Sequence, residues 1–194
     1  MAETAAAAAK PSTYLLVDGE NIDATLGMSV LGRRPNPEER PRWDRVRAFA
    51  SDVWDHDARG LFFLNATNGQ MPMSFVQALL AMDFQPIPLA GASQEKVVDI
   101  GIQRTMQAIL DQGYGDVLLA THDGDYIPQL EGLLDAGRQV GVMCFREFLN
   151  AEVTAMTERG LHVYDLEDDL GAFTSVLPRV RIIPLEAFDP TRYL

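Results

Sequence analysis

Residues 13–18 read TYLLVD and residues 116–121 read DVLLAT, and these two stretches decide the fold. Each is a short apolar run rich in Leu and Val, which is typical of a strand buried on both faces of a parallel sheet. Strand-like and helix-like patterns alternate through the rest of the chain. Repeated β-α-β units with short connections predict an α/β domain in which helices cover a parallel sheet.

The expected elements follow from hydrophobic spacing and from turn residues. We expect strands at 13–18, 60–66, 84–89, 116–121, 138–145 and 161–165. We expect helices at 43–55, 74–82, 94–111, 126–136 and 147–158, with Ser74 and Ser93 as N-caps of the second and third. A loop is expected between the first strand and the first helix. The prolines in 84–89 favour an edge position for that strand.

The chain of 194 residues has the length of one α/β domain. We expect a disordered leader over residues 1–12, the domain itself over 13–165, and an extension over 166–194 that packs on the domain. The acidic stretch DLEDD at 165–169 is expected to be a solvated turn. Residues 179–188 are expected to add a late strand or to wrap the body.

The N-terminal stretch does not look like a targeting signal. It reads MAETAAAAAK, lacks a basic n-region, and its alanines are too weakly apolar to span a membrane. Cys144 is the single cysteine, so an internal disulfide is impossible. With no export signal, we expect a cytoplasmic location and no membrane partner.

Acidic residues follow both of the strands that decide the fold. Asp18 ends the first strand, and Asp123 and Asp125 come shortly after the second. In open α/β sheets the ligand site lies outside the carboxyl ends of the strands, so these side chains are expected to share one rim. Clustered carboxylates repel one another unless a cation holds them. The sequence therefore predicts a divalent metal at this rim.

Asp99 is a fourth candidate for the same site. It begins an expected helix and lies on the same side as the apolar residues Ile102 and Met106. An acidic side chain that faces inward needs a partner. Lys96, three residues earlier, can supply that partner, and so can a metal ion.

Each of these acidic residues also has a purely structural explanation. Asp18 with Gly19 can form a strand-ending turn, and Asp123 or Asp125 can cap a helix. Asp99 can offset the dipole of its helix. Any one acidic residue alone is explained in this way, whereas their joint occurrence favours a site.

A basic segment follows the first strand. Residues 33–47 hold six arginines against three acidic residues, a net charge of +3, while the whole chain carries −12. The overall charge argues against a broad nucleic-acid-binding surface, because phosphate contacts need Lys and Arg. Two interpretations stay open: a solvated loop and helix start, or an arm that holds a phosphate backbone through Arg33, Arg34, Arg40 and Arg42.

Three stretches of the chain, in this order, resemble the NYN domains of the PIN-like nuclease superfamily, of which bacterial LabA-like proteins are examples. The stretches are YLLVDGEN at 14–21, KVVD at 96–99 and THDGDY at 121–126. The resemblance covers residues 13–165. It implies a three-layer α/β/α sandwich around a mainly parallel sheet, PIN-like in type, with a ribonuclease site that depends on Mg²⁺ or Mn²⁺.

The resemblance also implies roles for individual residues. Catalysis and metal binding are expected of Asp18, Asp99, Asp123 and Asp125. Substrate binding is expected of Asn21, Lys96 and Thr121. From the charge of the basic segment, and not from the resemblance, it is also expected of Arg33 and Arg34. Thr121 and His122 stand where the family usually has Ser and Gly. Threonine keeps the hydroxyl group, whereas His122 adds a bulky ring that can titrate.

The expected function is a metal-dependent ribonuclease that hydrolyses RNA phosphodiester bonds. The alternative is a non-catalytic RNA-binding or protein-adaptor module with the same fold. The intact acidic set favours the enzyme, while the net charge, His122 and the lack of a dedicated RNA-binding domain favour the adaptor. RNA is the expected partner, and a homodimer or a protein partner stays open. Motifs of NTPases, dinucleotide enzymes, serine hydrolases and thiol oxidoreductases do not occur.

Overall fold

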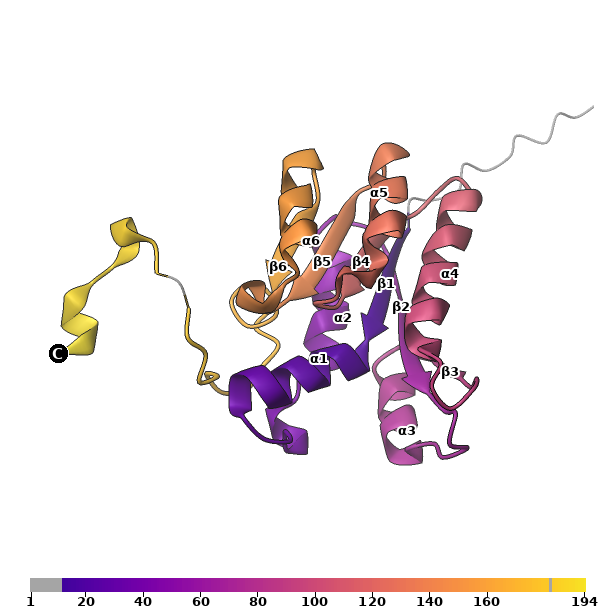
Figure 1. Ribbon diagram of the computed structural model, residues 1–194, viewed down its shortest axis with the longest axis horizontal. Helices are drawn as coiled ribbons and strands as arrows, with labels where there is room; N and C mark the ends of the chain where they lie inside the picture. The colour runs from indigo at the N-terminus through magenta and orange to yellow at the C-terminus, as the bar shows by residue number, and fades with distance from the viewer. Residues whose placement is uncertain (1–11, 182) are drawn as a thin grey trace, which may run out of the picture.

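The computed structural model describes residues 12–181 and 183–194. The disordered leader expected over residues 1–12 lies outside the described residues, apart from Ser12. The described chain forms a six-stranded sheet with helices on both faces (Figure 1). The predicted three-layer α/β/α sandwich is therefore confirmed.

All neighbouring strands of the sheet pair in parallel. The strands are β1 (Thr13–Asp18), β2 (Ala58–Asn65), β3 (Phe84–Leu89), β4 (Asp116–Ala120), β5 (Val140–Cys144) and β6 (His162–Asp165). Their order across the sheet is β3-β2-β1-β4-β5-β6, so β3 lies at an edge, as its prolines predict. The chain moves from β1 to β3 in one direction and from β4 to β6 in the other. The direction thus reverses between β1 and β4.

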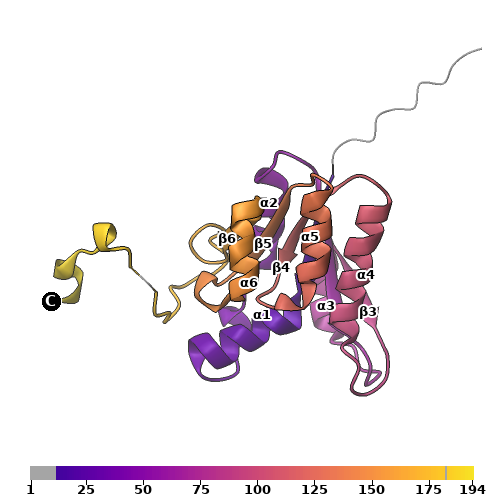
Figure 2. The same ribbon diagram turned by 45° about the horizontal axis from the view of Figure 1, so that its top comes forward.

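The helices divide between the two faces of the sheet. They are α1 (Gly19–Thr25), α2 (Trp43–Asp52), α3 (Met73–Ala81), α4 (Val97–Asp111), α5 (Ile127–Asp135) and α6 (Ala151–Ala155). Buried side chains of α2 and α3 belong to one apolar core, and those of α4, α5 and α6 belong to the other. Figure 2 shows α4, α5 and α6 on one side of the strands. No helix in the described part of the chain is both long and apolar enough to cross a bilayer.

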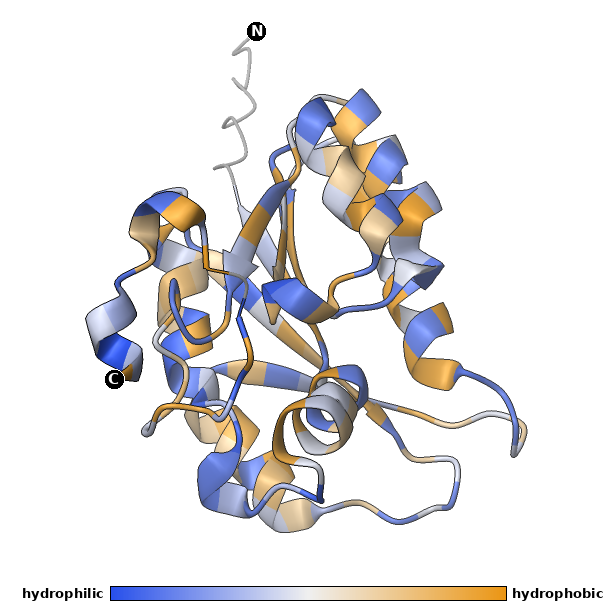
Figure 3. Cartoon of the chain, turned by 60° about the vertical axis from the view of Figure 1, so that its left-hand side comes forward, coloured by the Kyte–Doolittle hydropathy of each residue, from blue (hydrophilic) through white to orange (hydrophobic). Residues whose placement is uncertain are grey.

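Helix α4 shows how the sequence pattern produces this layering. Ile102, Met106 and Ile109 recur at helical spacing and are buried against the sheet. The banding of apolar and polar residues along the helices is visible in Figure 3. The helix ends as predicted near Gly113, whose φ of 80° is a left-handed conformation that glycine adopts without strain.

The segment after β1 is helical, which corrects the predicted loop. Helix α1 continues into a π-helix over Leu26–Leu31, and Figure 1 shows α1 lying beyond the tip of the β1 arrow. Asp-Gly signals a turn in a sequence, but the side chain of Asp18 here caps α1 by accepting a hydrogen bond from the N–H of Asn21. The buried side chain of Ile22 then holds the helix on the core.

Two predicted helix starts and one predicted helix are also corrected. Helix α3 begins after Pro72 and α4 after Lys96, so neither Ser74 nor Ser93 is an N-cap. The helix expected at 147–158 is shorter, because Asn150 caps α6 with its side chain and interrupts the pattern.

The acidic stretch at 165–169 was predicted to be a solvated turn, and the structure confirms this only in part: the chain turns here and Asp168 and Asp169 are exposed, but Asp165 is buried. Asp165 is 1% exposed, and its carboxylate accepts hydrogen bonds from the guanidinium of Arg179 and from backbone N–H groups of the same turn. Arg179 also pairs with Glu147 and Glu167. The sequence shows the acidic run but not its partner, which lies fourteen residues further on.

The C-terminal extension packs on the body only in its first part. Leu166, Leu170, Phe173 and Leu177 are buried in the core that also holds α2 and α3. The described residues 183–194 are exposed and project away from the body (Figure 1), unlike the packing expected for the whole of 166–194. The described part of 179–188 contains a 3₁₀ turn at Leu185–Ala187 and not the late strand that was predicted. It contacts the body only at its start, where Arg179 and Arg181 form ion pairs with Glu167.

Candidate metal centre

The candidate site lies where the strand order reverses. In open parallel sheets, the crevice beyond the carboxyl ends of the strands at such a point is the usual ligand site. Asp18 is the last residue of β1, and Asp123 and Asp125 lie in the turn after β4. Asp99 lies in the first turn of α4, which starts at the same end of the sheet. The fold therefore brings the four predicted acidic residues to one rim.

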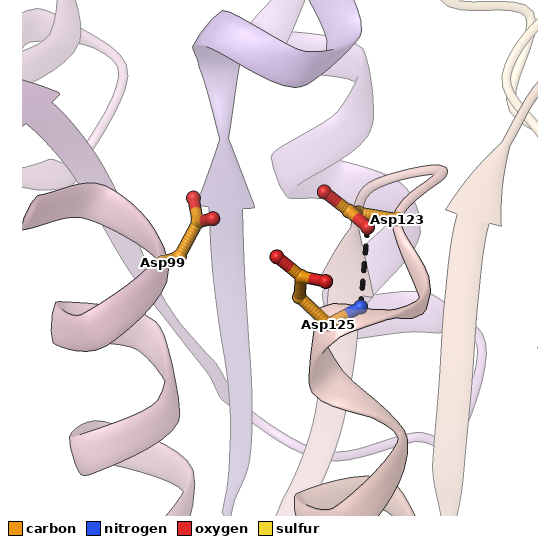
Figure 4. Close-up of side chains that lie close together, drawn as sticks. All are labelled: Asp99, Asp123 and Asp125. Carbon is orange, nitrogen blue, oxygen red and sulfur yellow. Dashed lines mark hydrogen bonds between the residues drawn. The ribbon is translucent and has the colours of Figure 1, made fainter. Parts of the chain in front are cut away.

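Three of these residues form a compact cluster. One carboxylate oxygen each from Asp99, Asp123 and Asp125 lies within 4.8 Å of the others. Figure 4 shows the side chain of Asp99 extending from α4 towards the two carboxylates of the turn. Hard cations bind carboxylate oxygens at about 2.0–2.6 Å, so oxygens at this spacing can share one ion. The donor set of oxygens alone fits Mg²⁺ or Mn²⁺.

Lys96 supplies positive charge to this cluster. Its Nζ lies 2.6 Å from Oδ2 of Asp125 and 3.3 Å from Oδ2 of Asp99. The hydrogen bonds to Asp125 and Asp99 raise the pKa of Lys96. The lysine side chain is 64% exposed, and exposed ion pairs are weak. The ammonium group can therefore leave the cluster when a stronger cation binds.

Hydrogen bonds between neighbouring residues shape the turn that carries Asp123 and Asp125. The N–H of Asp123 donates to Oγ1 of Thr121 over 3.2 Å, and the N–H of Asp125 donates to Oδ1 of Asp123 over 3.1 Å. Nε2 of Gln103 donates to the carbonyl oxygen of Asp125 and so links α4 to the turn. Thr121, which we expected to bind substrate, uses its hydroxyl oxygen in this turn.

Glycine at position 124 lets the turn lie close to Asn150. A Cβ atom there would lie 2.7 Å from Nδ2 of Asn150, the residue that caps α6. The turn and the start of α6 consequently pack directly on each other. This contact limits the positions that the two neighbouring carboxylates can take.

Asp18 lies outside the cluster of three, although we expected all four acidic residues to bind one metal. Its carboxylate is 3% exposed and accepts hydrogen bonds from the N–H of Asn21 at 3.1 Å and from the hydroxyl of Tyr126 at 2.8 Å. Burial, with a contribution from the charge of Asp99, raises the pKa of Asp18 to about 6. Asp18 is thus a buried neighbour of the cluster that feels its charge.

Asn21 and His122 bind each other across the β1–β4 junction. Oδ1 of Asn21 accepts the backbone N–H of His122 at 2.8 Å and lies 3.0 Å from its Nδ1. The N–H of Phe145 donates to Nε2 of His122, so the ring proton is on Nδ1 and faces Asn21. Burial lowers the pKa of His122 to about 4, which keeps the ring neutral. His122 therefore braces the turn, and Asn21 joins α1 to it.

The arginines of the basic segment are mostly paired within the chain. Arg33 pairs with Glu39, Arg40 with Asp23 and Arg42 with Asp44, at nitrogen–oxygen distances of 2.6, 2.6 and 3.0 Å. Arg34 is exposed and makes no ion pair with any described residue. Of the two arginines that we expected to bind substrate, Arg34 is free to do so, whereas Arg33 must first leave Glu39.

The sequence analysis missed the roles of Tyr126 and Gln103. Tyr126 is fully buried, and its hydroxyl donates to Asp18. Burial, with contributions from the charge of Asp18 and this hydrogen bond, raises the pKa of the tyrosine. A tyrosine directly after the acidic turn is a usable signal, because a buried tyrosine hydroxyl needs a partner. Gln103 lies on the polar edge of α4 and gives no such signal in the sequence.

Comparison with known proteins supports the fold and nothing finer. No family model matches the chain, and no curated protein matches its sequence. A crystal structure of a protein of unknown function from Vibrio parahaemolyticus RIMD 2210633 resembles it with a TM-score of 0.63. The two share 16% sequence identity, and the match covers 83% of this chain and 96% of that chain. The arrangement of layers and strands is thus one that a solved structure also adopts.

Proposed function

We propose that this protein is a ribonuclease that requires Mg²⁺ or Mn²⁺ and hydrolyses RNA phosphodiester bonds. The observation that carries the proposal is the cluster of Asp99, Asp123 and Asp125, whose carboxylate oxygens lie within 4.8 Å of one another at the β1–β4 reversal. The resemblance of the three sequence stretches to NYN domains supports the same reaction. The motifs of that family carry acidic residues at the positions of Asp99, Asp123 and Asp125.

The residues that would hold the ion are Asp99, Asp123 and Asp125. When bound, such an ion polarises a phosphodiester and lowers the pKa of a water molecule beside it. The other roles belong to side chains of the chain itself. Asp18 adds negative charge behind the cluster, and the hydroxyl of Tyr126 fixes that carboxylate. Lys96, once released from Asp125, is placed to contact a phosphate oxygen.

The openness of the site favours a polymeric substrate. The side chain of Asp125 is 45% exposed, and that of Lys96 is more exposed still. Sites for small molecules usually enclose most of the ligand. A rim that is open to solvent suits a chain that lies across it, and the exposed guanidinium of Arg34 on the neighbouring segment can contact its backbone.

One observation favours the alternative, a non-catalytic RNA-binding or adaptor module. The ion pairs of Lys96 with Asp125 and Asp99 already offset part of the charge of the cluster. A protein that keeps this arrangement permanently has no need of a metal. The two functions therefore differ in whether a divalent ion displaces the lysine.

Cleavage of labelled RNA by the purified protein tests the proposal. The RNA is incubated with Mg²⁺, Mn²⁺ or EDTA, beside a DNA of the same sequence. We expect cleavage of RNA with metal, none in EDTA, and none by Asp123→Asn. Asp52→Asn is a matched control, because Asp52 is an exposed residue at the end of α2. Equal cleavage by wild type and Asp123→Asn would assign the activity to a contaminant, and RNA binding without cleavage would favour the adaptor.

A further inference from the structure

A second site lies beside the metal centre, at the carboxyl ends of β1 and β2. It is a pocket of about 530 Å³. Phe62, Leu64 and Phe75 give it an apolar lining on the face of the sheet that α2 and α3 cover. Gly19, the residue directly after Asp18, also lines it. The pocket and the acidic cluster are therefore neighbours along the same rim but on opposite sides of the β1 strand end.

Two aromatic residues of the pocket pack against each other, and Phe75 is the more accessible of the two. The rings of Phe62 and Phe75 meet edge to face, with centroids 5.3 Å apart and planes at 81°. Phe62 is buried and fixed by Trp43 and Phe84, whereas Phe75 is half-buried on α3. A Cβ atom on Gly19 would lie 2.5 Å from the ring of Phe62, so only glycine lets α1 start this close.

Four charged side chains line the mouth of the pocket, of which two are paired with each other and two are free to bind a ligand. Asp23 and Arg40 line the pocket but pair with each other at 2.6 Å. Glu20 and Arg34 also line it, are exposed, and form no ion pair with any residue that the structure describes. The pocket thus offers one free carboxylate and one free guanidinium around an aromatic floor.

We propose that this pocket binds an unpaired guanine base of a single-stranded RNA. Base rings stack on aromatic side chains, and the half-buried ring of Phe75 lines the pocket. Guanine carries two adjacent donors, N1–H and N2–H, which match the two oxygens of the Glu20 carboxylate. Adenine, cytosine and uracil lack such a donor pair. Arg34 contacts the phosphate next to the base. The inference rests on the proposed function and adds the base that positions the RNA.

Fluorescence polarisation in EDTA tests the pocket without any cleavage. The probes are labelled uridine heptamers whose central nucleotide is guanosine, adenosine, cytidine or uridine. We expect the guanosine heptamer to bind more tightly than the other three. Glu20→Gln should abolish this preference and leave binding of the all-uridine heptamer unchanged. Phe75→Ala should weaken binding of the guanosine heptamer by about 5- to 150-fold, the range for loss of one stacked base.

Met73→Ala is the matched control for Phe75→Ala, since Met73 is exposed on the same helix and does not line the pocket. Glu20 is exposed, so Glu20→Gln keeps the test valid even where Phe75→Ala fails to fold. Equal binding of all four heptamers, or a guanine preference that survives Glu20→Gln, would overturn the inference. A guanine preference with no cleavage in Mg²⁺ or Mn²⁺ would reject the ribonuclease function and support the guanine pocket. Cleavage without any base preference would support the ribonuclease function and reject the guanine pocket.

Discussion

The ammonium group of Lys96 lies 2.6 Å from the carboxylate of Asp125, on the cluster where a divalent ion would bind. The lysine thus supplies positive charge to the same carboxylates that would bind the ion. It lies twenty-nine residues before Asp125 in the sequence. A divalent ion at this cluster would compete with the lysine, because the same carboxylates attract both. Each cation would offset part of the negative charge of the three carboxylates.

Replacing Lys96 with Met should therefore strengthen metal binding and weaken the metal-free protein. Without the ammonium group, repulsion among Asp99, Asp123 and Asp125 is unrelieved until an ion binds. The rise in melting temperature on adding millimolar Mn²⁺ should be larger than in wild type, as mass action requires for tighter binding. Differential scanning fluorimetry measures both quantities. Arg104→Met on the same helix is the control, and an equal rise in both variants would contradict the competition.

Asp99→Asn should remove most of the stabilisation that a metal gives. In wild type, a metal ion whose free concentration is 100 times its dissociation constant would stabilise the native state by about 2.7 kcal/mol. In the variant one charged ligand is lost, while the metal-free protein is relieved of repulsion and should be as stable as wild type or more so. Thermal denaturation in EDTA and in Mg²⁺ tests this. A wild-type melting temperature that does not change with either metal would exclude the site.

Asp18→Asn should stabilise the metal-free protein at neutral pH and not at pH 4. Burial raises the pKa of Asp18 to about 6 from its model-compound value of 3.8, so the folded state favours the protonated form. A raised pKa gives stability that is full below 3.8 and is lost as the pH rises through about 6. At pH 7.5 the buried charge costs about 1–3 kcal/mol, which asparagine avoids.

Urea denaturation in EDTA at the two pH values measures this difference between Asp18→Asn and wild type. His122 titrates in the same range with the opposite sign, because its pKa is lowered to about 4 and protonation of the unfolded chain destabilises the fold as the pH falls. Comparing the variant with wild type at each pH cancels this contribution. A gain that is equal at both pH values would show that Asp18 is not charged at neutral pH.

The sequence predicts the layers well because apolar runs and helical stripes are local signals. TYLLVD and DVLLAT become the central strands β1 and β4, and the order of βα units then places Asp18 beside the turn of Asp123. The stripe of Ile102 and Met106 predicts α4 and carries Asp99 to the same rim. The rim of acidic residues is consequently predictable from spacing and topology together.

The finer features of the site depend on contacts between distant residues, which no local pattern shows. The pair of Lys96 with Asp125 and the hydrogen bond from Tyr126 to Asp18 each join different elements of the fold. The tautomer of His122 depends on the N–H of Phe145. These contacts decide that Asp18 is a buried neighbour and not a member of the cluster, which the sequence motif alone does not reveal.

The basic segment provides the last prediction, on RNA binding. The exposed pairs of Arg33, Arg40 and Arg42 leave Arg34 as the arginine of this group with no acidic partner among the described residues. Arg34→Ser should weaken RNA binding and lower the magnitude of its salt slope by about 0.7, the value for one phosphate contact on a single strand. Changing all four arginines to serine should weaken RNA binding less than threefold further than Arg34→Ser alone does. The other three arginines contribute little, because each must break an existing ion pair before it can contact RNA.

Binding is measured by polarisation over a range of salt concentrations, and cleavage is measured at saturating RNA. Arg34→Ser should cleave normally once bound, because a phosphate contact positions the backbone and does not hold the metal. Asp18→Asn should show the opposite pattern, with normal binding and lost cleavage. Arg59→Ser, an exposed arginine on β2, is the control. If Arg34→Ser binds and cleaves like the parent, the segment is a solvated loop whose arginines serve the ion pairs seen in the structure.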